Sequence, residues 1–439
     1  GLLNNDCLWV LDEIQLMGPG LATTTQLDAF RRTFGTARPH RTLWMSATLD
    51  RERLGTVDFA PRLETLSTMS LTEEDKRVPE VAKRTGAHKI LKKAPLPGDD
   101  TKAIAEFAFE RHRPGTRTLV VVNRVKRAQE IYSQLDNIAK HAPKKGKNAP
   151  AVCLLHSRFR PRERAAAFER AVAEPSGNGT IVVATQVIEA GVNISSRLMI
   201  TDIAPWSSMV QRFGRNARFG EFGPDDPAGI FWIETDPFRF AGSSKKKASS
   251  NASWAAPYET AAIAAAREQL ELLEGENAAP SRLPKVPEPF AYSFVLRRKD
   301  LRDFFDTTPD LTGLDTDVSR FIRDSEELNV HVFWRDLAGK QPSSEEPHPE
   351  RDELCSAPLG DILDPKKKWN ARLWDGIDRK WVPCKRPAPG MTLMLDIANG
   401  GYDATLGWTG ATSDVPSLDD TPKDGRAEEG NDDDPLAEG

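Results

Sequence analysis

The sequence predicts an α/β protein: parallel-sheet domains with helices on both faces, followed by a mixed α+β module near the C-terminus. Short, continuous apolar runs alternate with helical patterns between residues 7 and 233. Such runs are typical of parallel strands that are buried on both faces. Polar residues directly follow several of these runs. Because ligands bind beyond the carboxyl ends of parallel strands, we expect the functional residues there.

The expected elements follow from apolar runs for the strands and from helical periodicity for the helices. Strands are predicted at residues 7–11, 42–45, 118–122, 151–155, 181–183, 198–201 and 230–233. Helices are predicted at residues 23–34, 125–135, 161–173, 208–213 and 258–274. In the C-terminal module, strands are predicted at residues 330–334 and 392–397 and a helix at residues 299–305.

Composition excludes several classes of protein. The 439 residues are 39% hydrophobic and 28% charged, with a mean hydropathy of -0.50, which is typical of a soluble globular protein. No apolar run approaches the roughly 18 residues of a membrane-spanning helix, so no membrane partner is expected. The four cysteines form no CxxC pair. We therefore expect no disulfide framework or zinc site, and a reducing cytoplasm is the expected location.

Charge is unevenly distributed along the chain. Residues 411–439 hold ten acidic and two basic residues, and this tail is expected to be disordered. Residues 81–170 hold 21 basic and 8 acidic residues. Such an excess indicates either a solvated surface or a footprint for the phosphates of a nucleic acid, and charge alone does not decide between them.

An acidic pair follows the first predicted strand, in the sequence LWVLDEIQ. Asp12 could hold Mg²⁺ while Glu13 deprotonates an attacking water during phosphoanhydride hydrolysis. The alternative is an acidic first turn of a helix. After the second strand, the hydroxyls of Ser46 and Thr48 could relay hydrogen bonds between segments, or they could belong to a plain turn.

The run QRFGRNAR holds the most specific pattern. If it is helical, Gln211, Arg215 and Arg218 lie on one face, at positions i, i+4 and i+7. Two arginine forks aimed at a terminal phosphate would stabilise the charge of a transition state. A basic surface helix is the alternative. In the preceding run TIVVATQVIEAGVN, Thr185 could contact a nucleic-acid phosphate, and Gly191 with Asn193 could approach a ribose.

In this order the four segments resemble motifs II, III, V and VI of superfamily 2 helicases: DEIQ, SAT, ATQVIEAGVN and QRFGRNAR. The resemblance implies RecA-like domains, here one partial and one complete, that bind ATP and Mg²⁺. It implies that Asp12 holds Mg²⁺, that Glu13 activates water, and that arginines of motif VI reach the phosphates. The residues implied to couple hydrolysis to strand movement are Gln15, Ser46 and Thr48.

A narrower resemblance is carried by the sequences LLHSRF at residues 154–159, VLRRKDLRDFFDTTPDL at 295–311, and the Gly- and Trp-rich end at 389–408. These segments are similar to the helicases of type I CRISPR interference, most of all to the type I-U or I-G variant. The resemblance implies ATP-driven 3′-to-5′ translocation on single-stranded DNA after recruitment by a crRNA-guided effector complex. The implied strand contacts are Asn123, Arg124, His156, Ser157, Arg158, Thr185 and Gln186; a structural role for His156 is equally open.

The chain also departs from this family. It has no GxxxxGK[ST] loop for the phosphates and only 11 residues before Asp12, so a truncated first domain with little hydrolysis on its own is expected. It has no His-Asp dipeptide, so the HD nuclease of the family is expected on a missing part or on another chain. Gln15 stands where many helicases have His or Asp, and Asn193 replaces a common Asp.

The resemblance and the Pro-rich stretches together predict five regions. These are the end of the first RecA-like domain (1–80), the second RecA-like domain (81–245), a helix and linker (246–289), a C-terminal module (290–410) and the tail (411–439). Two other functions stay open. One is another superfamily 2 enzyme, such as an RNA helicase or repair translocase. The other is a non-catalytic remnant that binds nucleic acid or a partner.

Overall fold

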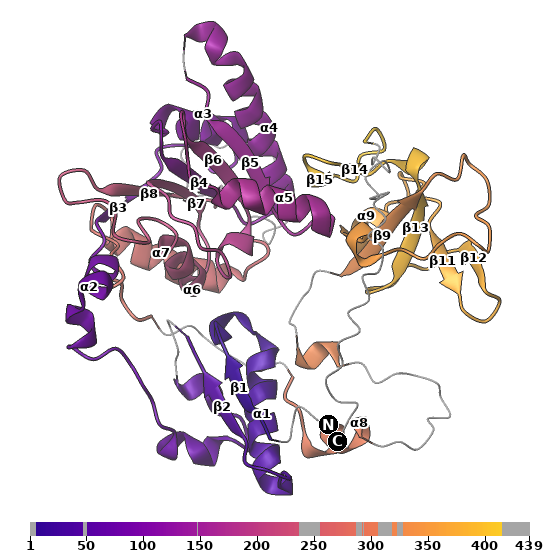
Figure 1. Cartoon of the computed structure of the whole chain (residues 1–439), viewed down its shortest axis with the longest axis horizontal. Coiled ribbons are helices and arrows are strands. Elements are labelled where there is room, and N and C mark those ends of the chain that lie inside the picture. Colours follow the sequence, from indigo (N-terminus) through magenta and orange to yellow (C-terminus); the bar gives the residue numbers. More distant parts are fainter. Residues whose placement is uncertain are drawn as a thin grey trace, which may run out of the picture. The chain divides into compact units, whose positions relative to one another are not determined.

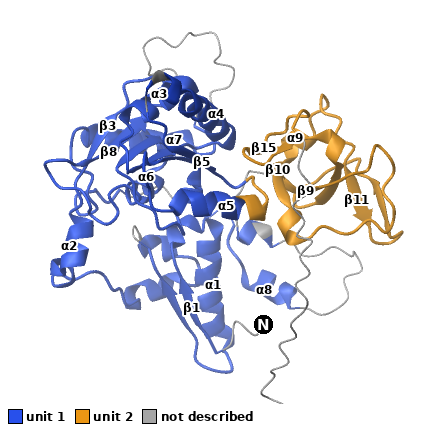
Figure 2. Cartoon of the chain, turned by 45° about the horizontal axis from the view of Figure 1, so that its top comes forward, with its two compact units in different colours: residues 1–157, 164–327 blue, residues 158–163, 328–439 orange. Residues whose placement is uncertain are grey.

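The computed structural model describes residues 6–46, 51–146, 148–236, 255–286, 292, 294–305, 318–322 and 328–414. The chain divides into two compact units, which Figure 2 shows in two colours. Unit 1 comprises residues 1–157 and 164–327, and unit 2 comprises residues 158–163 and 328–439. In the described ranges, no helix is long and apolar enough to span a bilayer. Thr48 and the tail beyond residue 414 lie outside those ranges.

A six-stranded, fully parallel sheet dominates unit 1 (Figure 1). Its order is β3-β8-β7-β4-β6-β5. Every residue of β4, β6 and β7 is buried, because these inner strands have neighbours on both sides and helices on both faces. The predicted parallel sheet is confirmed. The strands are β3 (Lys89–Lys93), β4 (Arg117–Val121), β5 (Ala151–Leu155), β6 (Thr180–Ala184), β7 (Leu198–Asp202) and β8 (Ala228–Ile233).

Helices cover both faces of this sheet (Figure 1). Successive side chains of a strand point to opposite faces. Leu119 and Val121 of β4 pack in one core with α5 (Pro161–Val172), α6 (Trp206–Phe213) and α7 (Thr260–Leu272). On the opposite face lie α3 (Thr101–Arg111) and α4 (Val125–His141), where Phe107 meets the ring of Phe231 with 5.1 Å between the ring centroids.

The N-terminal part of unit 1 is a smaller parallel pair. Strand β1 (Leu8–Leu11) pairs in register with β2 (Arg41–Trp44), and α1 (Pro19–Phe34) connects them. The helix begins four residues before its predicted start, because Pro19 favours the first turn of a helix. Leu21 and Ala29 of α1 pack against Ile14, Leu54 and Phe59.

Unit 2 contains a five-stranded mixed sheet of order β10-β9-β13-β11-β12, with β9 and β13 parallel and the other pairs antiparallel. A short β14–β15 hairpin closes over its core, in which Trp334, Tyr402 and Trp408 are buried. The elements are β9 (Asn329–Arg335), β10 (Cys355–Pro358), α9 (Leu359–Ile362), β11 (Arg372–Asp375), β12 (Lys380–Pro383), β13 (Thr392–Asp396), β14 (Tyr402–Asp403) and β15 (Gly407–Trp408). The predicted strands at 330–334 and 392–397 are thereby confirmed.

One strand of the large sheet and one helix that covers it were not predicted from the sequence. Strand β3 reads KILKK, and its lysines mask the apolar pattern because β3 is an edge strand. Helix α3 lies in the basic region, where no helix was predicted. Its N-cap, Asp100, accepts a hydrogen bond from the amide of Ala103 at 2.9 Å, as is typical of a helix start. Two further short helices lie in unit 1, namely α2 (Pro79–Thr85) and α8 (Arg298–Phe304), the latter near the predicted 299–305.

A buried lysine connects β3 to the end of α6. Lys89 is 1% exposed, and its Nζ donates to the carbonyl of Phe213 at 2.8 Å and to that of Asn216 at 2.6 Å. Carbonyls at a helix C-terminus lack partners within the helix and attract cations. Burial lowers the pKa of Lys89 to about 8, and nearby Glu221 only partly offsets that effect. Lys89 therefore holds the turn that follows α6.

Replacing Lys89 tests this burial through pH. The folded pKa lies below the ordinary 10.5, so the unfolded chain binds more protons between about pH 8 and 10.5. The stability of the wild type relative to Lys89→Met should therefore rise across that window, by on the order of 3 kcal/mol. Chemical denaturation at several pH values measures it. Lys92→Met, at an exposed position of β3, should show no such trend, and a pH-independent difference for Lys89→Met would contradict the assignment.

Helix α7 offers a matched pair for its packing on the sheet. Leu270 is fully buried in the core of the large sheet, whereas Leu272 on the same helix is 76% exposed. Leu270→Ala should lower the free energy of unfolding by about 2–5 kcal/mol, because it removes buried methyl groups and leaves a cavity. Leu272→Ala should change it by less than about 0.5 kcal/mol. Equal effects in denaturant titrations would show that α7 does not pack as described.

Candidate nucleotide and nucleic-acid site

The carboxyl ends of four neighbouring strands form one row in unit 1. Val121 of β4 pairs with Ala184 of β6 and with Thr201 of β7, and Leu155 of β5 also pairs with Ala184. The residues that follow these strand ends therefore lie at one edge of the sheet. They are Asn123 after β4, His156 after β5, Thr185 and Gln186 after β6, and Asp202 at the end of β7.

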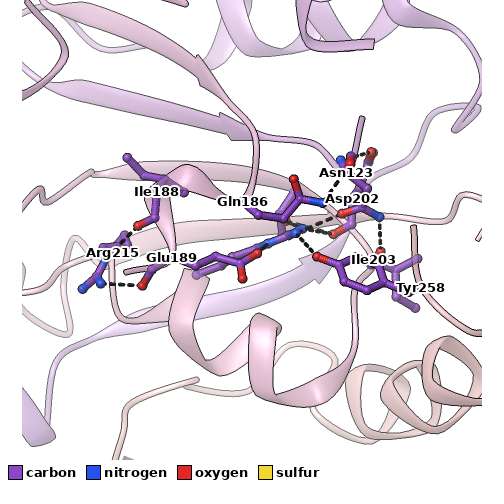
Figure 3. Close-up of polar contacts among 10 residues, drawn as sticks. Asn123, Gln186, Ile188, Glu189, Asp202, Ile203, Arg215 and Tyr258 are labelled. Carbon is purple, nitrogen blue, oxygen red and sulfur yellow. Dashed lines mark hydrogen bonds and ion pairs between the residues drawn. The ribbon is translucent and has the colours of Figure 1, made fainter. Parts of the chain in front are cut away.

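Arg212 of α6 is the centre of a buried polar network in this row; its partners Asn123, Glu189 and Asp202 are labelled in Figure 3. Its Nε donates to Oε1 of Glu189 at 2.8 Å. One terminal nitrogen donates to Thr201 Oγ1 at 3.0 Å and to the Asp202 carbonyl at 2.9 Å, and the other donates to Asn123 Oδ1 at 2.9 Å. Burial lowers the pKa of Arg212, but Glu189, Tyr258 and Asp202 together outweigh that effect, so the pKa is raised.

Asn123 and Gln186 complete the network. The side-chain amide of Asn123 donates to the carbonyl of Ile203 at 2.7 Å, and Gln186 Nε2 donates to the backbone carbonyl of Asn123 at 2.8 Å (Figure 3). Asp202 accepts the amide of Asn123 at 3.1 Å and a bidentate pair from Arg127 at 3.0 Å. The loops after β4 and β6 are thereby fixed to each other.

The helical arrangement predicted for QRFGRNAR is wrong. Helix α6 ends at Phe213, so Gln211, Arg215 and Arg218 do not share a helical face. Two i+3 hydrogen bonds tighten the chain, from the amide of Arg215 to the carbonyl of Arg212 and from that of Asn216 to that of Phe213. Ala217 then adopts a φ of 44°, which cannot continue a helix. Gly214 lies at the C-cap and Lys89 binds the last carbonyls, which fixes the end.

The two arginines of this turn instead bind the loop after β6. Arg215 is 5% exposed and donates to the carbonyls of Ile188 at 2.9 Å and Glu189 at 2.5 Å (Figure 3). Burial lowers the pKa of Arg215, and the charge of Arg218 lowers it further. Arg218 is partly exposed, and its Nε donates to Asn193 Oδ1 at 3.1 Å. Between these anchors Gly191 has a φ of 69°, where a side chain would be strained.

The acidic pair belongs to a relay of side chains in unit 1. Ser46 Oγ donates to Gln15 Oε1 at 2.5 Å, and Gln15 Nε2 donates to Glu13 Oε2 at 2.5 Å. Gln211 Nε2 is 3.4 Å from the same Glu13 oxygen, a long hydrogen bond. Glu13 has a left-handed backbone (φ 50°, ψ 44°) and accepts these bonds on one oxygen only among the described residues. Three of the four motif segments thus meet at Glu13.

Asp12 is the residue in this group that suits a magnesium ion. It is exposed, and one carboxylate oxygen accepts the amide of Glu13 at 2.9 Å. Mg²⁺ keeps several waters and needs only one or two carboxylates, so an exposed carboxylate fits it. Over the described ranges, no group of three or more His, Cys, Asp or Glu side chains could form a protein-only metal cage. All four cysteines are free.

The predicted strand contacts differ in exposure. Arg124 and Ser157 are exposed, whereas Asn123, His156 and Thr185 are at most 6% exposed. Arg158 is half-buried and belongs to unit 2. Within unit 1, the structure therefore brings Asn123, Arg124, His156, Ser157, Thr185 and Gln186 to one edge of the sheet but exposes only some of them to solvent.

Several residues of the network were not predicted from the sequence. Glu189 offered a usable signal, because a lone carboxylate in the apolar run TIVVATQVIEAGVN indicates a buried ion pair. Arg212 lies inside the predicted motif, but the sequence does not show that its side chain is fully buried while that of Arg218 is partly exposed. Tyr258, whose hydroxyl lies 3.4 Å from Arg212, comes from a segment with no polar pattern.

Two sequence comparisons match part of the chain. Residues 114–221 match the family described as CRISPR-associated nuclease/helicase Cas3, C-terminal. The CRISPR-associated nuclease/helicase Cas3 of Methanothermobacter thermautotrophicus is 33% identical over 121 residues, which are 27% of this chain and only 13% of that protein.

Solved structures match most of the chain. The structure of T. fusca Cas3 with AMPPNP has a TM-score of 0.57 at 15% identity, over 88% of this chain and 50% of that one. A chain of a CRISPR RNA-guided surveillance complex in a pre-nicking state has a TM-score of 0.50 at 14% identity, over 88% and 53%. These likenesses confirm the predicted RecA-like fold class. Together with the sequence matches, they confirm that the chain resembles the CRISPR-associated nuclease/helicases called Cas3.

Proposed function

We propose that the chain is the motor portion of an ATP-dependent translocase that moves on single-stranded DNA in type I CRISPR interference. The observation that carries the proposal is the relay from Ser46 through Gln15 to Glu13, which Gln211 joins from α6. Because the carboxylate of Glu13 is hydrogen-bonded to separate segments, a change in its protonation would alter the hydrogen bonds of each segment. The chain spans about half the length of the similar solved chains.

In this proposal Asp12 and Glu13 divide the chemistry of hydrolysis. Asp12 would hold Mg²⁺, which supplies charge neutralisation to phosphate oxygens. Glu13 accepts both hydrogen bonds on Oε2, and its Oε1 would take the proton of the attacking water. Gln15 keeps the carboxylate oriented, which is a positioning role for a residue that departs from the family pattern.

The positive charge for the phosphates comes from the turn after α6. Arg218 is partly exposed and would present its planar fork to the γ-phosphate region. Arg215 holds the carbonyls of Ile188 and Glu189, and so fixes the loop that carries Gly191 and Asn193 toward a ribose. The charge of Arg215 also interacts with the carboxylate of Glu13.

The DNA strand would run along the carboxyl edge of the large sheet. Arg124 and Ser157 are the exposed contacts, and the basic excess of residues 81–170 supports binding of a phosphate backbone. Arg158 is a further contact, while Asn123, His156, Thr185 and Gln186 shape the edge. Recruitment by a crRNA-guided complex in the cytoplasm, and cooperation with an HD nuclease domain, complete the proposal; they rest on the similarity to Cas3.

Glu13→Gln tests the assignment in the full-length protein. Glutamine keeps the size of the side chain and removes the base, so ATP hydrolysis stimulated by single-stranded DNA should fall by about 100-fold or more. Nucleotide binding, followed with a fluorescent ATP analogue, should persist. Glu64→Gln, at an exposed acid of the same unit, should leave turnover unchanged. Full turnover by Glu13→Gln, or equal loss in both variants, would refute the role of Glu13.

A further inference from the structure

The loop between β5 and α5 belongs to the C-terminal module. The chain leaves β5 after Leu155, and residues 158–163, which include the first turn of α5, form one compact unit with residues 328–439 (Figure 2). Residues that connect β5 to α5 of unit 1 therefore pack as part of unit 2. Nothing in the similarity of motifs predicts this arrangement.

Backbone hydrogen bonds fix the loop inside unit 2. The amide of Trp408 donates to the carbonyl of Arg158 at 2.8 Å, and the amide of Arg160 donates to the hydroxyl of Tyr402 at 3.1 Å. Phe159, between these two anchors, is 4% exposed. The two hydrogen bonds lie on either side of the buried ring of Phe159, and together they restrict this part of the loop to one conformation.

Tyr402 also binds the side chain of Arg160. The guanidinium carbon of Arg160 lies 4.8 Å from the centroid of the Tyr402 ring, and its Nε donates to Glu163 Oε1 at 2.8 Å. Tyr402 itself is fully buried and packs against Trp334 with 5.4 Å between ring centroids. Burial raises the pKa of Tyr402, so its hydroxyl stays protonated at working pH. Arg160 is therefore clamped between an aromatic face and a carboxylate.

The same loop presents other groups outward. Ser157 and Arg162 are exposed on either side of the clamped residues, and Arg164 follows on the exposed side of α5. Hydroxyl and guanidinium groups on a fixed backbone suit the phosphates of a nucleic-acid strand, because a preformed loop loses little entropy on binding.

We propose that the C-terminal module positions the β5–α5 loop for binding single-stranded DNA, and that Tyr402 is the positioning residue. This inference rests on the proposed function and gives the module of residues 328–414 a role in it. Tyr402 does not touch the DNA; it fixes the backbone of Arg160 and, through it, the groups at Ser157 and Arg162.

Tyr402→Phe in the full-length protein tests the proposal, because it removes the hydroxyl and keeps the ring. The concentration of labelled oligothymidine that gives half-maximal ATPase stimulation should rise about 2–10-fold, as expected for one lost hydrogen bond, with kcat unchanged at saturating DNA. Trp374→Phe is the matched control in the same module, since Trp374 contacts Trp381 and His348. A rise for Trp374→Phe equal to that for Tyr402→Phe, or no rise for Tyr402→Phe, overturns the proposal.

Hydrogen exchange separates this inference from the proposed function. In Tyr402→Phe, the amides of residues 158–163 should exchange faster, while those of β9 and β13 keep their protection. If the wild-type protein shows no stimulation by single-stranded DNA, the proposed function fails, and the exchange result still decides the positioning role of Tyr402. Unchanged exchange at residues 158–163 overturns that role by itself.

Discussion

The buried guanidinium of Arg212 is the interaction on which the candidate site depends. A buried charge costs several kcal/mol unless every donor finds an acceptor. Here the acceptors come from the ends of β4 and β7 and from the loop after β6: Asn123 Oδ1, Thr201 Oγ1, the Asp202 carbonyl and Glu189 Oε1. Each of these segments is thereby held in place. If one of them moved away, a donor of the buried guanidinium would lose its acceptor, and the folded state would be destabilised.

That constraint explains why the other two arginines sit where they do. Arg212 anchors the last turn of α6, Lys89 binds the carbonyls beyond it, and the chain turns instead of continuing as a helix. The turn delivers Arg215 to the carbonyls of the loop after β6 and Arg218 to Asn193. Arg212 and Arg215 therefore hold the loops in place, and Arg218 remains for binding. The division follows burial, since Arg212 has no exposed surface and Arg218 does.

Much of the fold was predictable because buried parallel strands leave continuous apolar runs. The runs of β4, β6 and β7 are of this kind, and the carboxyl ends of these strands form the edge where Asn123, Thr185 and Asp202 lie. The edge strand β3 failed because lysines interrupt its pattern. The helical face of Gln211, Arg215 and Arg218 failed because a helix end is set by partners distant in sequence, here Lys89. Likewise, no local pattern shows that residues 158–163 pack with Tyr402 and Trp408.

A double-mutant cycle on Arg212 and Glu189 tests the central claim most directly. Arg212→Met alone leaves a buried carboxylate unpaired, and Glu189→Leu alone leaves a buried guanidinium unpaired, so each should lower the free energy of unfolding by about 3–5 kcal/mol. The double variant removes both charges and should recover at least about 2 kcal/mol relative to the sum of the single changes. Effects that add within about 0.5 kcal/mol would show that the two groups do not depend on each other, and would contradict the account.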